Sequence, residues 1–249
     1  MGDLRGPRRR GRALRGRAGR DEHAGPGANR PRGAGRIHAL LQTFPSGPAA
    51  AAPRFANYIA ATGLVEAVAA GTRRIRAWQP SPAEAQLADL ADDLANTLAG
   101  HEHDRPVPLG RQLVHGDFWD SNVRLRHNQV ALVTDFDFLG ERPRTDDLAL
   151  TLYFTSVDIT DITSDPAQLA ELVGAYEAGL GTGLSQHERA AIPLAMARQP
   201  LWSISVWVAL LDSQATARRH LAATAPELAW AQQLTRRIAQ VQDALTSRP

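Results

Sequence analysis

His115-Gly116-Asp117-Phe118-Trp119-Asp120-Ser121-Asn122 is the stretch that decides how this chain folds and acts. It places the carboxylate of Asp117 five positions before the carboxamide of Asn122, between two short apolar runs typical of β-strands. A second acidic pair, Asp135 and Asp137, ends the next apolar run. Transfer of a phosphoryl group requires one residue to orient the attacking hydroxyl and others to hold Mg²⁺ on the phosphates. Carboxylate and carboxamide oxygens suit both tasks, because Mg²⁺ prefers oxygen ligands. The spacing therefore predicts a phosphoryl-transfer site.

Three motifs in this order resemble the aminoglycoside phosphotransferase family of small-molecule kinases: Leu113–Asp117 with Asn122, Asp135–Asp137, and Asp146–Ala149. Ile37–Leu41 is similar to the short helix that opens the C-terminal lobe of these kinases. The resemblance covers residues 36–249 and implies an α+β, mostly helical fold. We expect a protein-kinase-like C-terminal lobe with a small catalytic β-hairpin.

The resemblance also implies a role for each motif residue. Asp117 would be the catalytic carboxylate that orients the substrate hydroxyl or accepts its proton. Asn122 and Asp135 would bind Mg²⁺ on the phosphates of ATP, or of GTP. The acceptor would be a hydroxyl group of a small molecule, such as an aminoglycoside, choline or homoserine.

Further residues would support the loop or contact the acceptor. By resemblance, His115 and Gly116 would shape the catalytic loop, and Asp147 would brace it through hydrogen bonds to backbone N–H groups. In the family, the helices after the metal-binding aspartate help to form the substrate pocket. Candidate contacts in that pocket are Asp158, Asp161 and Trp202.

Two other interpretations of the acidic residues stay open. A metallohydrolase could use His115, Asp117, Asp135 and Asp137 as a metal cluster, since imidazole and carboxylate groups bind transition metals. That interpretation leaves Asn122 without a role. Alternatively, the acids are turn residues at strand ends, where Asp is common. At the level of function, the rival to a kinase is a non-catalytic binding or scaffold protein with a kinase-like fold.

Residues 1–35 differ from the rest of the chain. They carry ten arginines against three acids, whereas the remainder carries eighteen arginines against twenty-three acids. The segment has nine glycines and few apolar residues, so we expect it to be disordered. It lacks an aromatic residue for base stacking, so its charge does not favour nucleic-acid binding. The acidic remainder suits a cationic or neutral small substrate.

The family pattern is incomplete in this sequence. Family members carry an N-terminal lobe with a phosphate-covering loop and a lysine that contacts the nucleotide. This chain has no lysine and no G-x-G-x-x-G loop, and only 35 residues precede the expected first helix. We therefore expect a C-terminal lobe whose N-terminal lobe is missing, and an enzyme that is incomplete or weakly active.

Composition excludes several other classes. The chain has no cysteine, so disulfides, thiol nucleophiles and zinc–thiolate sites are excluded. It has no apolar run of about eighteen residues, which argues against a membrane span. An apolar segment typical of a secretory signal does not follow the basic start. We expect a cytoplasmic protein, and the sequence does not indicate an oligomeric state.

Local signals predict the remaining elements. Hydrophobic spacing, capping boxes and prolines indicate helices, and short alternating runs indicate strands. The predicted strands are 112–114, 123–126 and 129–134. The predicted helices are 37–41, 54–70, one from Ser81, 145–156, 166–180, one from Ser185 that Pro193 and Pro200 kink or split, and 226–245.

Overall fold

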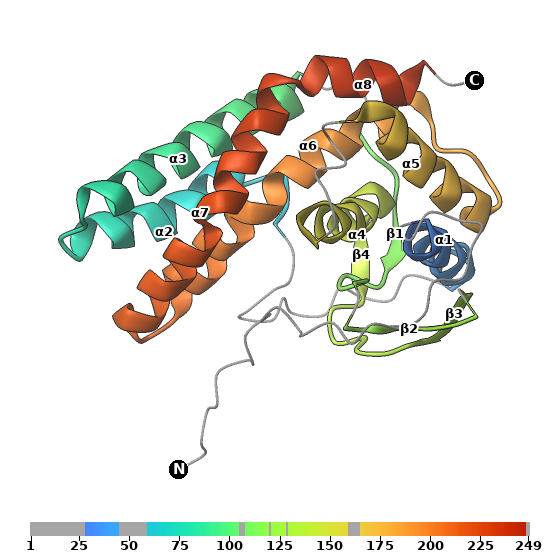
Figure 1. The fold of residues 1–249 in the computed structure, drawn as a ribbon, viewed down its shortest axis with the longest axis horizontal. Coiled ribbons are helices and arrows are strands. Elements are labelled where there is room, and N and C mark those ends of the chain that lie inside the picture. Colours follow the sequence, from blue (N-terminus) through green and yellow to red (C-terminus); the bar gives the residue numbers. More distant parts are fainter. Residues whose placement is uncertain are drawn as a thin grey trace, which may run out of the picture.

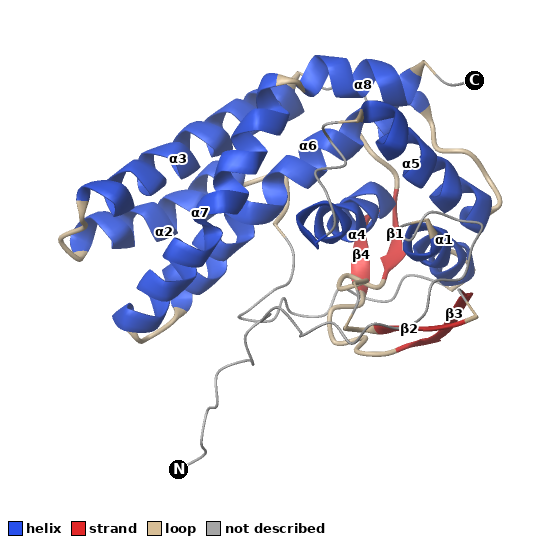
Figure 2. Ribbon diagram, in the orientation of Figure 1, coloured by secondary structure: helices blue, strands red, loops and turns tan. Residues whose placement is uncertain are grey.

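The computed structural model describes residues 28–44, 59–104, 108–119, 121–127, 129–158 and 165–247. Helices dominate this part of the chain, with four short strands near its middle (Figure 2). The helices are α1 Asn29–Leu41, α2 Leu64–Ala77, α3 Pro82–His103, α4 Arg144–Asp158, α5 Pro166–Leu180, α6 Gln186–Ser203, α7 Gln214–Arg236 and α8 Ile238–Thr246. A π-helix, η1, follows α6 at Ile204–Val208. The strands are β1 Arg111–Val114, β2 Val123–Arg126, β3 Gln129–Val133 and β4 Gly140–Pro143.

The elements form two groups joined by α6 (Figure 1). Helices α2, α3 and α7 lie side by side in one group and contact α6 or η1. The other group contains α1, α4, α5 and the strands, with α1 packed on α5. One continuous hydrophobic core runs through both groups. None of the helices described is long and apolar enough to cross a membrane.

Two antiparallel pairs of strands hold the loops that carry the motifs. β1 pairs with β4, so that Val114 lies opposite Gly140. β2 and β3 form the predicted hairpin, in which Val123 lies opposite Val133. These registers bring two loops together. Loop 115–122 runs from β1 to β2, and loop 134–139 runs from β3 to β4.

Capping residues fix the helix starts that the sequence predicted. The Ser81 and Ser185 hydroxyls each accept a hydrogen bond from the backbone N–H three residues later, and the Glu84 and Glu188 carboxylates each accept one from the backbone N–H of the cap residue. Such reciprocal capping boxes satisfy backbone groups that a helix start otherwise leaves unpaired. The predicted helices from Ser81 and Ser185 are therefore confirmed.

Three predicted boundaries are wrong. α1 begins at Asn29, so residues 29–35 of the segment that we expect to be disordered are helical; residues 1–27 lie outside the described part of the chain. The helix expected at 54–70 begins only at Leu64, because Gly63 has left-handed backbone angles, with φ 76°. The last long helix begins after the Ser213 cap and continues through Pro226, where we had placed its start.

Close backbone contact fixes how α1 sits on α5. A β-carbon on Gly35 would lie 2.2 Å from the Tyr176 carbonyl oxygen, and one on Gly179 would lie 2.0 Å from the Arg32 carbonyl oxygen. Only glycine permits two helices to approach this closely at these points. The contact brings His38 of α1 against Tyr176 of α5, and this matters for the site described below.

Candidate active site

Asp117 and Asn122 lie together in the loop between β1 and β2. The Asn122 side-chain amide donates hydrogen bonds to the Asp117 backbone oxygen and to its Oδ2, both at 2.9 Å. Their exposed fractions are only 5% and 7%, yet both are polar groups whose partners are supplied within the loop. Since the amide N–H₂ of Asn122 faces Asp117, its Oδ1 is the atom left to act as a ligand.

Helix α4 holds this loop at two points. Asp147 accepts a hydrogen bond from the Gly116 backbone N–H at 3.1 Å through Oδ1. One helical turn later, the Thr151 hydroxyl donates to the Phe118 carbonyl oxygen at 2.9 Å. Phe118 is 1% exposed and belongs to the hydrophobic core. The backbone on both sides of Asp117 is therefore fixed to α4, which limits how far its carboxylate can move.

His115 joins the catalytic loop to the loop that follows the hairpin. Its Nδ1 accepts a hydrogen bond from the Asp117 backbone N–H at 3.2 Å, and its Nε2 lies 3.0 Å from the Thr134 carbonyl oxygen. A backbone N–H can only donate and a carbonyl can only accept, so the proton of the neutral ring sits on Nε2. The side chain is fully buried, and its ring lies 4.6 Å from that of Phe136.

The hairpin brings the backbone just before Asp135 against Asn122. The Thr134 N–H donates to the Asn122 carbonyl oxygen at 2.9 Å, directly beyond the Val123–Val133 pair. Asp135 has φ 65°, in the left-handed region that residues other than Gly, Asn and Asp rarely adopt. Its side chain is exposed, whereas that of Asn122 is buried.

The donor set fits Mg²⁺ better than it fits a protein-only metal cluster. Within the described residues, no three His, Cys, Asp or Glu side chains are grouped closely enough to hold a metal ion. The metallohydrolase interpretation, which needed His115, Asp117, Asp135 and Asp137 around one ion, therefore has no support in this geometry. Mg²⁺ bound to a nucleotide needs only one or two protein oxygens, because phosphates and water complete its shell. Asn122 and Asp135 can supply those two.

A buried residue that local sequence patterns did not identify, His38, also supports the loop. His38 of α1 is fully buried; its Nε2 lies 2.9 Å from Oδ2 of Asp147 and its Nδ1 lies 2.7 Å from the Tyr176 hydroxyl. Burial, together with the nearby charge of Asp147, raises the pKa of Tyr176 far above its usual value, so the hydroxyl keeps its proton. The hydroxyl can therefore donate to Nδ1, and the ring can donate from Nε2 to Asp147.

Buried ion pairs connect the same end of α4 to helices α6 and α3. Arg198 of α6 is 2% exposed and contacts Asp146 Oδ1 at 2.5 Å and Glu102 Oε1 at 3.3 Å. Asp146 directly precedes Asp147, so this network ties both α3 and α6 to the start of α4. The sequence did not reveal this network, because Arg198 lies in an apolar helix 52 positions after its partner.

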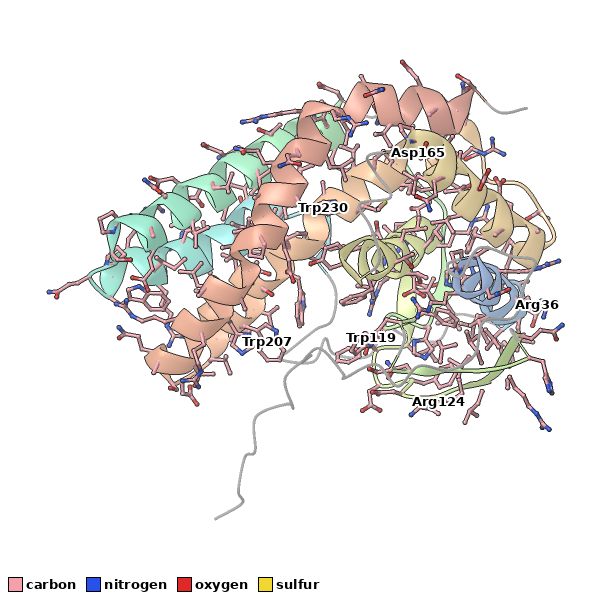
Figure 3. The ribbon with its side chains drawn as sticks, viewed as in Figure 1. Arg36, Trp119, Arg124, Asp165, Trp207 and Trp230 are labelled. Atoms are coloured by element: carbon pink, nitrogen blue, oxygen red, sulfur yellow. The ribbon has the colours of Figure 1, made fainter. Side chains whose placement is uncertain are left out.

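The residues predicted for the substrate pocket are less well placed by the structure. Trp202 is half-buried near the end of α6, and its ring meets that of Trp207 edge-on at 5.1 Å. Trp207 in turn stacks on His220 of α7 at 5.3 Å (Trp207 is labelled in Figure 3). Asp158 is the last residue of α4 and its side chain is not described, and Asp161 lies outside the described residues. Their roles stay predictions.

A different aromatic row begins at the catalytic loop. The ring of Trp119, labelled in Figure 3, lies 5.0 Å from Phe154 of α4. Tyr153 follows at 5.2 Å from Phe154, and Trp230 of α7 lies 5.5 Å from Tyr153. Trp119 thus packs against α4, as expected of a hydrophobic anchor of the loop.

A cavity of about 430 Å³ opens at the other end of β1, away from the catalytic loop. It is lined in part by Gln42, Gln112 and the ion pair of Arg144 with Glu188, in which the guanidinium makes bonds of 2.6 Å and 3.0 Å to the carboxylate. Burial alone would raise the pKa of Glu188, but the bonds from Arg144 and the Ser185 backbone outweigh it and hold the pKa below its usual value. The bidentate pair stabilises the start of α6.

Comparisons with known proteins agree with this architecture. A sequence model of the phosphotransferase enzyme family matches residues 5–194. The chain resembles the solved structure of amicoumacin kinase hAmiN in complex with AMP-PNP, Ca²⁺ and Ami, with 16% identity and a TM-score of 0.52 over 85% of this chain and 59% of that one. It also matches a choline/ethanolamine kinase family protein from Mesorhizobium loti, with 17% identity and a TM-score of 0.46 over 83% of this chain and 65% of that one. Among curated proteins, no sequence matches significantly.

The family model confirms the predicted family, and the likeness to the amicoumacin kinase structure confirms the mostly helical, kinase-like fold. The chain spans 59% of the length of the amicoumacin kinase and 65% of that of the second protein. The matches do not assign a role to any single residue.

Proposed function

Because the chain belongs to the phosphotransferase enzyme family, we propose that it takes part in transferring the terminal phosphoryl group of ATP, or of GTP, to a hydroxyl of a small molecule. One observation carries the proposal: the Asp117 carboxylate is held at 2.9 Å by Asn122 inside a loop that α4 fixes on both sides. A carboxylate that a neighbouring side chain holds in place can orient the hydroxyl group of an acceptor.

Asp117 would act on the acceptor. Its Oδ2 accepts a hydrogen bond from the Asn122 amide, and the carboxylate held in this way would accept the hydrogen bond of the substrate hydroxyl. Orienting that hydroxyl towards the phosphorus contributes most of the catalysis that a protein can give to such a loose transition state. As the phosphoryl group moves, Asp117 would take up the hydroxyl proton.

Asn122 and Asp135 would hold Mg²⁺. The bound ion would neutralise charge on the transferred phosphoryl group. The proposal is supported by the hairpin, in which the backbone of Thr134, the residue before Asp135, bonds that of Asn122, and by His115, whose ring lies between the Asp117 backbone N–H and the Thr134 carbonyl oxygen. A nucleotide analogue and a divalent cation are bound in the amicoumacin kinase structure, which supports a nucleotide and a metal here as well.

The acceptor is proposed to be cationic or neutral. Residues 36–249 carry eighteen arginines against twenty-three acids, and Asp117 itself must face the acceptor. An anionic acceptor would be repelled by these carboxylates. Amino alcohols and aminoglycosides meet the condition, and both carry the hydroxyl that the chemistry requires.

The test uses the full chain with Mg²⁺, labelled ATP or GTP and a panel of amino alcohols and aminoglycosides. Because the chain has no lysine to contact the nucleotide phosphates, we expect slow label transfer to at least one acceptor. Asp117→Asn should lower that transfer by roughly a hundredfold or more, consistent with general-base removal. Asp137→Asn serves as the matched control, since it changes an exposed acid two residues from Asp135 and should keep most of the activity.

Two results would contradict the proposal in different ways. Nucleotide and metal binding without transfer to any acceptor would favour the alternative of a non-catalytic binding protein. Transfer that survives Asp117→Asn unchanged would reject the assigned mechanism.

A further inference from the structure

Arg142 of β4 reaches the two loops that carry the proposed catalytic and metal-binding acids. Its Nη2 donates a hydrogen bond to the Phe138 carbonyl oxygen at 2.8 Å. Phe138 lies in the segment between Asp135 and the start of β4, so this bond fixes the end of the metal-binding loop. The Arg142 side chain is half-buried and belongs to a strand, which gives it a rigid base.

The same guanidinium touches the catalytic loop at Gly116. Gly116 has φ 81°, and a β-carbon there would lie 2.3 Å from the Phe138 carbonyl oxygen and 2.8 Å from Arg142 Nη1. Glycine is therefore required at this position by both its backbone angle and the space available. The Arg142 guanidinium therefore lies close to two groups. One is the backbone of Gly116, next to Asp117, and the other is the Phe138 carbonyl oxygen.

We propose that Arg142 is a positioning residue that holds the metal-binding loop against the catalytic loop, and so sets the distance between Asp135 and Asp117. The inference rests on the proposed function, because it concerns how the two loops of that site are held relative to each other. Because the Arg142 guanidinium bonds the Phe138 carbonyl oxygen in one loop and lies close to Gly116 in the other, it can hold the two loops together.

The shape of the side chain matters as well as its charge. Arginine presents several N–H donors in a planar fork, so one nitrogen can bond Phe138 while another lies against Gly116. A lysine would place a single ammonium and could serve only one of these positions. Methionine would keep most of the apolar stem and remove the fork.

The experiment measures Mn²⁺ binding to the full chain in the presence of a non-hydrolysable ATP analogue, by electron paramagnetic resonance. We expect Arg142→Met to weaken Mn²⁺ binding by roughly tenfold or more, in the range seen when residues that orient metal ligands are changed. Arg142→Lys should give an intermediate loss. Arg111→Met is the matched control, because Arg111 bonds the Glu141 carbonyl from the other strand of the same sheet but lies at its far end. The Mn²⁺ affinity of Arg111→Met should stay within about twofold of the wild type, since Arg111 does not reach the loops.

A purely structural role would lower the urea midpoint without changing the Mn²⁺ affinity of the folded protein, and that result would overturn the inference. If Arg142→Met does not fold, Arg142→Lys carries the test by the same criterion. Asp135→Asn separates the two hypotheses. If it abolishes Mn²⁺ binding while both Arg142 variants bind like wild type, the proposed function stands and the inference fails. If Asp135→Asn has no effect, the proposed metal site itself is wrong.

Discussion

Replacing His38 with leucine tests whether the buried Tyr176–His38–Asp147 connection supports the catalytic loop. Leucine has a similar size, so the change mainly removes two hydrogen bonds from a fully buried position. It leaves the Tyr176 hydroxyl and Oδ2 of Asp147 without His38. An unsatisfied buried polar group costs about 1–3 kcal/mol, and a charged one costs more. We therefore expect a loss of about 3–5 kcal/mol in the free energy of unfolding.

A smaller change isolates one bond of the pair. Tyr176→Phe removes only the hydroxyl and should cost about 1–2 kcal/mol, because His38 Nδ1 then lacks its donor. The two variants share one hydrogen bond, so the double variant should be more stable than the sum of the single losses predicts, by about 1 kcal/mol. His187→Leu is the control, since His187 is exposed and its change should stay within about 0.5 kcal/mol.

Urea unfolding at pH 7, followed by circular dichroism, gives these free energies from the midpoint and slope. Since domains are stable by only about 5–15 kcal/mol, the expected loss would be plain in the midpoint. A His38→Leu variant within about 0.5 kcal/mol of the wild type would refute the reasoning. Strict additivity of the two single changes would show that His38 and Tyr176 do not interact.

Three further predictions concern the elements around the site. Glu188→Gln should flatten the loss of stability on acidification, because the lowered pKa of Glu188 stabilises the folded protein above the pKa that this group has in the unfolded chain, and that stabilisation is lost as the pH falls through the folded pKa. The stability advantage of the wild type over the variant in urea unfolding should therefore be largest above about pH 5 and shrink as the pH falls towards about 3, and a difference that does not depend on pH would contradict this. Thr151→Val removes the hydroxyl that bonds the Phe118 carbonyl oxygen, so it should lower the free energy of unfolding by about 1–2 kcal/mol and lower the rate of phosphoryl transfer. The Thr155 hydroxyl bonds the Thr151 carbonyl oxygen within α4, so Thr155→Val should leave the transfer rate unchanged. Equal transfer rates in the two variants would contradict this. Arg198→Met removes the guanidinium of a buried ion pair with Asp146 and should cost about 3–5 kcal/mol in urea unfolding. Adding Asp146→Asn should recover part of this loss, and no recovery would show that the charge of Asp146 is not the cause.

The sequence predicted those parts of the fold that depend on neighbours along the chain. Ser81 and Ser185 mark helix starts because their caps are made with residues three positions away. The hairpin and the pairing of Asn122 with Asp117 likewise involve separations of a few residues. Short-range patterns of this kind also explain why the order of the motifs was enough to predict the family and the fold class.

Pro226 and the region before α2 show where local signals fail. Pro226 is a strong sign of a helix start, but α7 already begins at Gln214, and Leu221 and Leu228 on either side of the proline are buried in the core. Burial of that apolar face outweighs the backbone bond that the proline removes. Before α2, an apolar pattern continued through Gly63, but the backbone there turns.

Only the tertiary structure decided which distant residues support the site. His38 meets Tyr176 across 138 positions and Asp147 across 109, and Arg142 reaches Gly116 because β4 pairs with β1. These contacts depend on which helix faces pack and on the closeness allowed by Gly35 and Gly179. A lone buried histidine or arginine gives no sign of its partner in the sequence, because the free energy that pairs them is gained only when the whole core forms.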